Sequence, residues 1–416
     1  MSTAIWWVRR DLRIIDNLAL RQALRIHSTV IPVFIIDPHL LNKKAAVRQA
    51  FLFNGLRRLD QTLRGRDSRL ILRQGDPVEV LAQLVSETGS AVVYAEEDFS
   101  PYARERDHKV GKTTTLNLQP GLTYRHPLTV VKQDGDPYTI FTPFSKVWKS
   151  LPFLDDLTWQ PPAQLPHIAN LTSEALPQFA ENSLFPPGEV EAQHRLKTFE
   201  TELIYTYADQ RDRLDLDGTS SLSPYFRFGM LSARQAVYTA IGAMKTAPDH
   251  ITRKSAETWV NELIWREFYQ SILYYFPDVL KQAFNPKLRQ IPWRTSIKDL
   301  QAWQQGLTGY PVVDACMRQL AETGWMHNRG RMITASFLTK DLLLNWQEGE
   351  TWFMQHLVDG DLASNNGGWQ WTAGVGTDAA PYFRIFNPIL QGQQHDPNGT
   401  YTRRWVPELT KVPLEY

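Results

Sequence analysis

The first 130 residues alternate between short apolar runs and stretches with helical spacing. The apolar runs cover residues 4–8, 30–36, 69–72 and 91–94. Between them, residues 16–27, 51–63 and 78–88 repeat apolar side chains at helical intervals, and Asp16 is the predicted N-cap of the first of these stretches. Strands that are apolar throughout and alternate with helices predict a parallel sheet that is covered on both faces.

The rest of the chain loses the strand signal. Residues 151–190 contain seven prolines, which predicts an irregular linker, and we place the whole linker at residues 131–190. Beyond it, stretches such as residues 256–275 and 330–346 have helical spacing. The expected architecture is a Rossmann-like α/β domain at residues 1–130, a long linker, and an all-helical domain at residues 191–416.

The sequence lacks the motifs of several common binding and catalytic sites. The turn after the first predicted strand reads Arg9-Arg10-Asp11-Leu12-Arg13, which differs from the G-x-G-x-x-G that binds dinucleotides. The sequence contains no P-loop, H-E-x-x-H or G-x-S-x-G motif, and it has one cysteine. We therefore expect neither an internal disulfide nor a metal site.

Bulk properties set further limits. No run of about 18 apolar residues occurs, and no charged segment followed by an apolar one stands at the N-terminus, so neither a membrane span nor a signal peptide is predicted. We expect a cytoplasmic protein. The net charge of +1 does not by itself indicate a nucleic-acid binder. Ten of the 14 tryptophans lie between Trp259 and Trp405, so a site built from large flat rings belongs to the helical half.

Two segments of this half carry candidate chemistry, each with a structural alternative. Residues 218–223 place four hydroxyls in six residues, which suits either a phosphate or a helix cap. Glu262, Trp265 and Arg266 share one helical face. They either bind a base-like ligand or form a core tryptophan beside a surface Glu–Arg pair.

Two further segments also suit a flat ligand. Asn328 and Met332 share a helical face and either contact such a ligand or belong to an ordinary helix start. In residues 359–374, the pair Gly367-Gly368 lets a ring lie against backbone, unless the segment is a turn with two core tryptophans. Its candidate polar partners are Asp359, Asp361, and Asn365 or Asn366. Together these residues indicate a large, flat, phosphorylated cofactor.

The assembled motifs resemble the photolyase/cryptochrome family over nearly the whole chain. They occupy residues 7–13, 141–144, 218–224, 261–268, 308–314, 324–329, 359–371 and 378–388. The resemblance is greatest to the class I cyclobutane pyrimidine dimer (CPD) photolyases. Met332 stands where (6-4) photolyases and animal cryptochromes carry histidine, and Asn365 stands where plant cryptochromes carry aspartate.

The resemblance implies that the helical domain binds a folded FAD, which is reduced (FADH⁻) in the active enzyme. The residues implied to bind its phosphates and adjoining parts are Tyr207, Thr219, Ser220, Ser221, Leu222 and Ser223. The residues implied on its isoalloxazine and ribitol side are Arg266, Asp359 and Asp361, with Asn365 opposite flavin N5. An electron wire is also implied, from Trp369 beside the flavin through Trp346 to Trp293 at the surface; core packing is the alternative for each tryptophan alone.

The implied activity is light-driven repair of CPDs in UV-damaged DNA, duplex or single-stranded, without sequence preference. Excited reduced FAD donates an electron to the flipped-out lesion, the ring splits, and the electron returns. The residues implied to recognise the lesion are Glu262, Trp265, Asn328, Met332 and Trp371. Glu262 is implied to hydrogen-bond the bases and to stabilise the radical anion. Arg211, Arg329 and Arg384 are implied to contact phosphates.

Two other functions remain open. One is a cryptochrome-like blue-light photoreceptor with the same flavin, although this chain lacks the long tail that signalling cryptochromes usually carry. The other is a flavin oxidoreductase with a redox substrate. For the quaternary structure, we expect a monomer.

A light-harvesting antenna is the second cofactor that the resemblance implies. The residues implied to line its cleft are Arg9, Arg10, Asp11, Asp37, Arg48 and Arg106. Folate-binding members carry a histidine near Lys43 and an Asn-Glu pair near Tyr102, and neither occurs here. We therefore expect 8-hydroxy-5-deazaflavin, with a second flavin (FMN or FAD) or no antenna as the alternatives, and folate as a less favoured choice.

Overall fold

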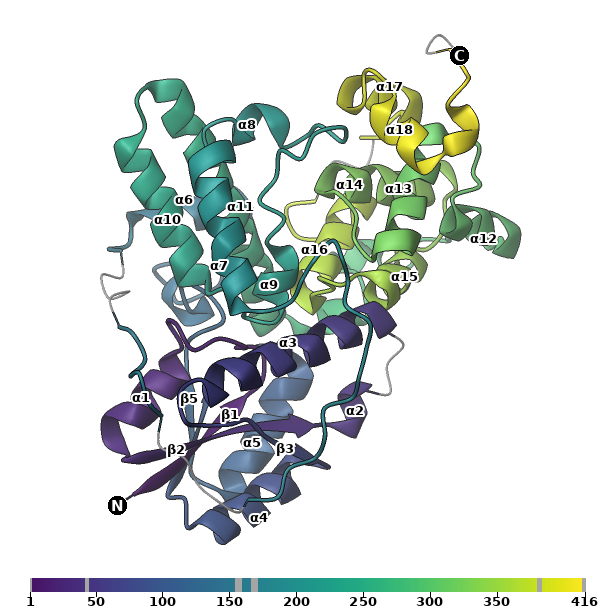
Figure 1. The fold of residues 1–416 in the computed structure, drawn as a ribbon. Coiled ribbons are helices and arrows are strands. Elements are labelled where there is room, and N and C mark those ends of the chain that lie inside the picture. The colour runs from purple at the N-terminus through teal and green to yellow at the C-terminus, as the bar shows by residue number, and fades with distance from the viewer. Residues whose placement is uncertain (1, 42–44, 154–158, 166–170, 380–383, 414–416) are drawn as a thin grey trace.

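The computed structural model describes residues 2–41, 45–153, 159–165, 171–379 and 384–413. In Figure 1 an N-terminal α/β part lies below a larger helical part, so the predicted pairing of an α/β with an all-helical domain is confirmed. Some predictions fall outside the described residues. They concern Lys43, residues 154–158 and 166–170 of the expected linker, and residues 380–383 of the last motif.

The sheet has five parallel strands. They are β1 (Thr3–Val8), β2 (Thr29–Ile36), β3 (Ile71–Gln74), β4 (Val92–Glu96) and β5 (Leu116–Gln119), hydrogen-bonded in the order β3-β2-β1-β4-β5. The four predicted strands are confirmed to within about two residues at each end, the usual uncertainty of such boundaries. The sequence does not predict β5, because LNLQ contains no apolar run and forms a half-exposed edge.

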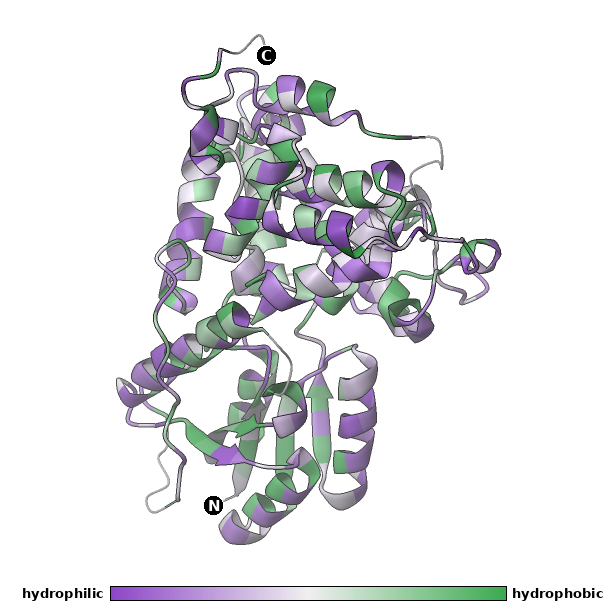
Figure 2. Ribbon diagram, turned by 90° about the vertical axis from the view of Figure 1, so that its right-hand side faces the viewer, coloured by the Kyte–Doolittle hydropathy of each residue, from purple (hydrophilic) through white to green (hydrophobic). Residues whose placement is uncertain are grey.

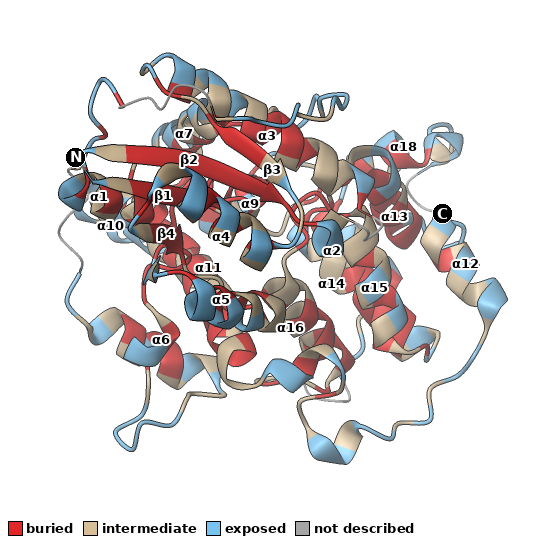
Figure 3. Ribbon diagram, turned by 90° about the horizontal axis from the view of Figure 1, so that it is seen from below, coloured by how far each residue is buried: buried red, intermediate tan, exposed pale blue. Residues whose placement is uncertain are grey.

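Alternate side chains of β1 point to opposite faces of the sheet, as the two-residue period of a strand requires. Ile5 and Trp7 pack against α4 (Pro77–Thr88) and α5 (Pro101–Thr113). Trp6 and Val8 pack against α1 (Leu18–Ile26) and α3 (Ala46–Arg64). Figure 3 shows the buried strands between these layers, with the short α2 (Pro38–Leu41) at one end.

The predicted N-cap of α1 is wrong by one residue. Asn17 is the cap, and its Oδ1 accepts a hydrogen bond from the backbone N of Leu20 at 2.9 Å. Asp16 adopts a φ of 50° instead, and its Oδ2 accepts from the hydroxyl of Ser232 in the helical domain at 2.6 Å. Both residues are good caps, so the local pattern does not separate them.

The expected linker contains a helix, α6 (Phe141–Ser150), and the short 3-10 turn η1 (Pro127–Thr129) lies just before it. α6 packs against the long α11 (His250–Tyr275). The described residues between Leu151 and Gly188 form no helix or strand, as their prolines predict.

The helical domain is built from many short elements around α11. In chain order they are α7 (Glu189–Thr198), η2 (Phe199–Leu203), α8 (Tyr207–Gln210), α9 (Ser223–Arg227), α10 (Ala233–Thr246), α11, η3 (Pro277–Leu280), η4 (Pro286–Leu288), α12 (Ile297–Gln305), α13 (Pro311–Thr323), α14 (Asn328–Ser336), η5 (Phe337–Asp341), α15 (Trp346–His356), α16 (Leu362–Ala373), α17 (Pro388–His395), α18 (Thr400–Trp405) and η6 (Pro407–Leu409).

The prediction of one helix over residues 330–346 is wrong. α14 runs into the π-turn η5, the chain leaves helical geometry at Leu343 with a φ of 57°, and α15 starts again at Trp346 with Asn345 as its cap. The apolar spacing continues across the break because α14, η5 and α15 bury side chains in the same core. The periodic pattern therefore conceals the break.

One core crosses from the sheet into the helical domain. It joins β1, α1 and α3 to α10 and α11, while a second core lies among α13 to α16. Figure 2 shows the apolar strands at the centre of the α/β part and mixed polarity along most helices. Within the described part of the chain, no helix combines the length and apolarity needed to cross a bilayer.

Candidate cofactor and substrate site

Asp361 stands at the start of α16 and accepts hydrogen bonds from several directions. As the N-cap, its Oδ1 accepts from the backbone N of Ala363 and of Ser364, both at 3.1 Å. Its Oδ2 accepts from Arg10 at 2.6 Å, so the α/β domain contacts this site directly. Although burial opposes it, Arg10 and two further arginines lower the pKa of Asp361 to about 2, which keeps the carboxylate charged.

Asp359 connects three segments that lie far apart in the sequence. Its Oδ2 accepts from the hydroxyl of Ser223 at 2.6 Å and from Arg331 at 2.8 Å. Its Oδ1 is buried and has no hydrogen-bond partner among the described residues. The motif-predicted residues Ser223 and Asp359 are therefore brought together, whereas Arg331 was not predicted. The only sequence signal for Arg331 is its place beside Met332 in a helix start with several arginines.

Arginines outnumber acids around the two aspartates. The cations are Arg10, Arg48, Arg227, Arg266 and Arg331, and the acids are Asp98, Asp359 and Asp361. Burial, and then repulsion by Arg10, lower the pKa of Arg227 to about 9, and its Nη1 has no partner among the described residues. A buried surplus of guanidinium groups beside an unpaired carboxylate oxygen fits a ligand with phosphates and ring donors. These residues thus fit FAD.

The serine-rich loop before α9 does not cap that helix. The N-cap of α9 is Leu222, and no side chain makes a capping hydrogen bond there. Thr219 and Ser221 hydroxyls lie 3.4 Å apart, and Ser221 has a φ of 50°. The helix-cap alternative is wrong, and Thr219, Ser220 and Ser221 lie partly exposed, in the loop that leads to the Asp359 partner Ser223. Tyr207, the first residue of α8, is buried.

The two glycines of α16 have different surroundings. A Cβ at Gly367 would lie 2.1 Å from the ring of Tyr269, so this glycine lets α16 approach α11. A Cβ at Gly368 would meet nothing within 4 Å. Gly367 therefore serves helix packing, while the approach of a ligand ring to the backbone stays a prediction for Gly368. On the same helix, Asn365 donates from Nδ2 to the backbone O of Glu350 at 3.0 Å.

The residues predicted to recognise a lesion lie on three helices that pack together. Glu262 and Trp265 are on α11, Asn328 and Met332 on α14, and Trp371 on α16; α16 packs against both other helices. The Asn328 Nδ2 and Met332 Sδ atoms lie 3.8 Å apart, so these two side chains do share a face. Trp371 is half-buried.

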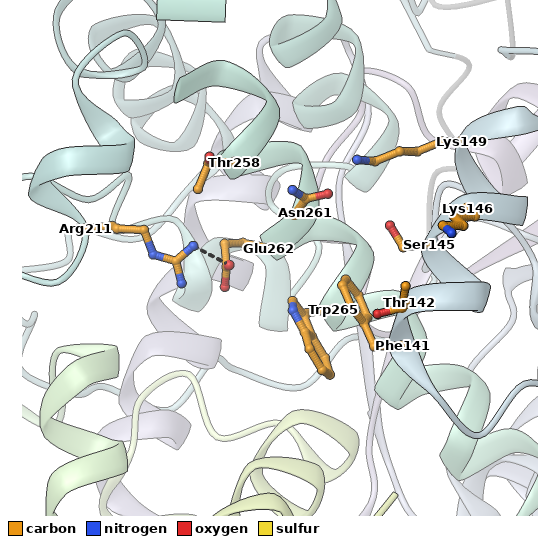
Figure 4. Close-up of a pocket in the computed structure, with 10 residues that line it drawn as sticks. All are labelled: Phe141, Thr142, Ser145, Lys146, Lys149, Arg211, Thr258, Asn261, Glu262 and Trp265. Atoms are coloured by element: carbon orange, nitrogen blue, oxygen red, sulfur yellow. Dashed lines mark hydrogen bonds and ion pairs between the residues drawn. The ribbon is translucent and has the colours of Figure 1, made fainter. Parts of the chain in front are cut away.

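Glu262 and Arg266 do not form the surface pair that we considered. Glu262 accepts from Arg211 at 2.6 Å, and Arg266 donates to the backbone O of Leu122 at 3.1 Å. Burial raises the pKa of Glu262, and Arg211 opposes that rise. Figure 4 shows the Arg211–Glu262 pair beside Trp265 in one pocket, where the ring of Phe141 stacks on Trp265 at 3.7 Å and 3°.

The three tryptophans of the predicted wire belong to one hydrophobic core, with burial falling toward Trp293. Trp369 and Trp346 are buried and Trp293 is half-buried. Trp369 lies against Gly349 of α15, one turn after Trp346. Trp293 precedes Arg294, whose backbone N donates to Leu343 O at 2.9 Å, just ahead of α15. The segments that carry the three rings therefore meet in one core.

Comparison with known proteins identifies the family. The family described as "DNA photolyase" matches residues 4–167, and "FAD binding domain of DNA photolyase" matches residues 259–416. The deoxyribodipyrimidine photo-lyase of Synechococcus sp. is 42% identical over 98% of this chain and 88% of its own length. The chain belongs to the DNA photolyase family.

Further photolyases agree with this assignment. The deoxyribodipyrimidine photo-lyase of Escherichia coli is 38% identical over 99% of this chain and 90% of its own length. A class III photolyase structure from Agrobacterium tumefaciens superposes with a TM-score of 0.92 at 35% identity, covering 100% of this chain and 89% of that one. The structure of an archaeal photolyase from Sulfolobus tokodaii with two FAD molecules superposes with a TM-score of 0.86 at 31% identity. The match covers 99% of this chain and 91% of that one.

In this photolyase the six residues predicted to bind the antenna fall into separate groups. Arg9 and Arg106 both pair with Asp107, and their guanidinium carbons lie 4.7 and 4.6 Å from the ring centre of Trp7. Asp37 accepts from the hydroxyl of Tyr102, on which the ring of His39 stacks at 4.4 Å.

The other three antenna candidates face elsewhere. Asp11 is buried and accepts from the Trp6 indole at 3.1 Å and from the Asn17 amide at 2.9 Å. Arg10 pairs with Asp361, and Arg48 donates to the backbone O of Leu357 at 2.9 Å. Arg10 and Arg48 therefore lie beside the aspartates of the predicted flavin site.

The three arginines predicted to contact DNA come from different segments. Arg211 pairs with Glu262, and Arg329 pairs with Asp212 at 2.6 Å. Arg384 is exposed, with its guanidinium carbon 5.6 Å from the ring centre of Phe386. Arg211 and Arg329 are thus neighbours through Asp212, while the residues just before Arg384 lie outside the described part.

Proposed function

We propose that this photolyase repairs cyclobutane pyrimidine dimers in DNA with light, as a deoxyribodipyrimidine photo-lyase. The single observation that supports this most strongly is the sharing of two helices between two sites. Asp361 of the cofactor site caps α16, which carries Trp371 of the lesion site, and α11 carries both Arg266 and Glu262. A cofactor and a substrate that contact the same helices are close enough for electron exchange.

Bound reduced FAD supplies the light-excited electron, and the residues of this chain position the reactants. Arg266, Asp359 and Asp361 hold the polar side of the cofactor, and the loop at residues 219–223 offers hydroxyls to its phosphates. Trp265 and Trp371 stack on the flipped dimer. Burial raises the pKa of Glu262, and the protonated carboxyl can donate a hydrogen bond to the pyrimidines, which stabilises the negative charge that they briefly carry.

We also propose how the protein contacts DNA, in which oligomeric state it acts and which antenna it binds. Arg211, Arg329 and Arg384 contact phosphates of single-stranded or duplex DNA without reading the sequence. The protein acts as a monomer. The antenna cleft, formed at Trp7, Arg9, Arg106 and Asp37, takes 8-hydroxy-5-deazaflavin or a second flavin; the two FAD molecules of the Sulfolobus tokodaii photolyase support the flavin alternative.

A repair assay tests the proposal against its rivals. The reduced protein is mixed with an oligonucleotide that carries one thymine dimer, and the recovery of thymine absorbance is followed under blue light and in the dark. We expect recovery only in the light. A flavin-containing protein that binds the lesion without repairing it indicates the photoreceptor, and dark turnover with a nicotinamide donor indicates the oxidoreductase.

A further inference from the structure

A cavity opens beside the proposed lesion site and extends away from it along α6. Its volume is about 410 Å³, and ten residues line it: Phe141, Thr142, Ser145, Lys146, Lys149, Arg211, Thr258, Asn261, Glu262 and Trp265. Figure 4 shows α6 and α11 on its two sides. None of the α6 residues has a role in the function proposed above.

The two helices present matching polar stripes to this cavity. On α6 the lining residues are 142, 145, 146 and 149, and on α11 they are 258, 261, 262 and 265. Both sets have the spacing i, i+3, i+4, i+7, which is one continuous face of a helix. Where two packed helices normally bury apolar side chains, these two expose hydroxyl, amide and ammonium groups to an open space. Such a face is suited to a ligand.

Each end of the cavity is fixed by a contact between the two helices. At one end Phe141 stacks on Trp265. At the other end Lys149 pairs with Glu257 at 2.9 Å. The stripe on α6 from residue 142 to residue 149 spans about 10 Å at the helical rise, longer than one nucleotide step of about 3.4 Å in a stacked strand.

The charge on the cavity wall favours an anion. Lys146, Lys149 and Arg211 line it. Arg211 pairs with the carboxylate of Glu262 at 2.6 Å and Lys149 pairs with that of Glu257 at 2.9 Å, so the ammonium group of Lys146 carries the surplus positive charge. Lys146 is exposed and makes no ion pair within the described part of the chain. The donors nearest to it on α6 are the hydroxyls of Thr142 and Ser145. Ammonium and hydroxyl groups together match the oxygens of a phosphodiester.

We propose that this cavity is a binding site for the damaged strand next to the lesion, in which Lys146 and Lys149 hold the flanking phosphodiester. The inference rests on the proposed function, because the cavity is continuous with Glu262 and Trp265. A dimer held against Trp265 leaves its strand beside α6. Phosphate binding there fixes the position of the strand on either side of the flipped dimer.

The test compares two substrates that differ only in flanking phosphates. One is a thymine dimer inside a single-stranded dodecamer, and the other is the bare dinucleotide dimer. The variant Lys146→Ala/Lys149→Gln is expected to bind the dodecamer about tenfold more weakly, with a shallower salt dependence by about one phosphate contact. Its binding of the dinucleotide and its flavin absorption spectrum are expected to be unchanged. Lys112→Ala, an exposed lysine of α5 in the other domain, is the control for loss of positive charge.

Three results overturn the proposal. The first is dodecamer binding that matches the unmodified protein, and the second is an equal loss for dodecamer and dinucleotide, which indicates a distorted lesion site. The third is an equal loss in the Lys112→Ala control, which indicates a general charge effect. If the unmodified protein binds neither substrate, the proposed function is wrong, and this inference, which rests on it, is wrong as well.

Discussion

At the residue scale, Trp369 is held by two aromatic neighbours and a glycine. Its ring meets those of Phe353 and Trp303 edge to face at 5.0 and 6.0 Å, and it lies against Gly349. Such packing fixes the ring rigidly, which suits a residue that passes an electron, although it also suits a plain core residue. Burial alone therefore does not separate the two roles.

A substitution at Trp369 does separate them. We expect Trp369→Phe to abolish the photoreduction of oxidised FAD, because phenylalanine is a poor electron donor, and to leave repair by chemically reduced protein intact. The measurement is the flavin spectrum during illumination with an external electron donor. Trp352→Phe, on α15 but outside the predicted wire, is the control and should photoreduce normally. Photoreduction that survives in Trp369→Phe rules out the wire.

Glu350 is a second residue with a measurable signature, because burial raises its pKa to about 7 and a hydrogen bond from Asn366 only partly opposes this. A carboxyl with a raised folded-state pKa stabilises the fold below its usual pKa, and that contribution is lost as pH rises through about 7. The melting temperature is thus expected to fall between about pH 5 and about pH 8, and to fall less in Glu350→Gln. The free energy of unfolding lost through this one group is at most about 3 kcal/mol. Parallel melting curves against pH for both proteins argue against this assignment.

At the element scale, the approach of α15 to α16 depends on one glycine. A Cβ at Gly349 would lie 2.1 Å from the ring of Trp369 and 2.7 Å from a methyl of Leu338. We expect Gly349→Ala to push Trp369 aside, to cost about 1–3 kcal/mol of stability, and to slow flavin photoreduction. Gly242→Ala in α10, where a Cβ meets nothing within 4 Å, is the control and should be neutral or stabilising. Equal stability of the two variants contradicts the packing shown by the fold.

Periodicity predicted the elements best where burial is one-sided and continuous. The first four strands and α11 are confirmed on that basis. The pattern fails at β5, which is short and half-exposed, and at residues 342–345, where the chain leaves the helix without losing its apolar spacing. In both places the deciding interactions are tertiary, so no local signal marks them.

At the scale of the whole molecule, the two domains meet through charged groups around Asp361. Arg10 of the α/β domain pairs with Asp361 at 2.6 Å and with Asp98 at 3.4 Å, and both of its partners are largely buried. The motifs indicate candidate functional residues, and they assign Arg10 to the antenna and Asp361 to the flavin. Their contact depends on how the domains dock, which a sequence read element by element does not contain. Arg331 was not predicted, and Phe141 was named only as part of a motif, because each contacts a partner far along the chain, Asp359 and Trp265 respectively.

The domain contact gives a stability prediction. Because removing one partner leaves a buried charge unpaired, Arg10→Gln is expected to lower the free energy of unfolding by about 3 kcal/mol and to weaken FAD retention. Arg58→Gln breaks an exposed pair with Glu181, at 47% and 46% side-chain exposure, and is the control. It should cost about 1 kcal/mol or less. Denaturant unfolding measures the loss of stability, and the fluorescence of released FAD measures the loss of cofactor. Equal losses in Arg10→Gln and Arg58→Gln count against an interdomain role for Arg10.

The central claim is that this chain splits a pyrimidine dimer with an electron that the reduced flavin donates and then recovers. The most direct measurement is a series of blue flashes on reduced protein with excess dimer-containing oligonucleotide, with the flavin spectrum and the remaining dimers recorded after each flash. The account predicts that dimers disappear over many turnovers while the reduced flavin spectrum stays the same. A loss of dimers that stops when one flavin per protein has been oxidised, or no loss at all, contradicts it.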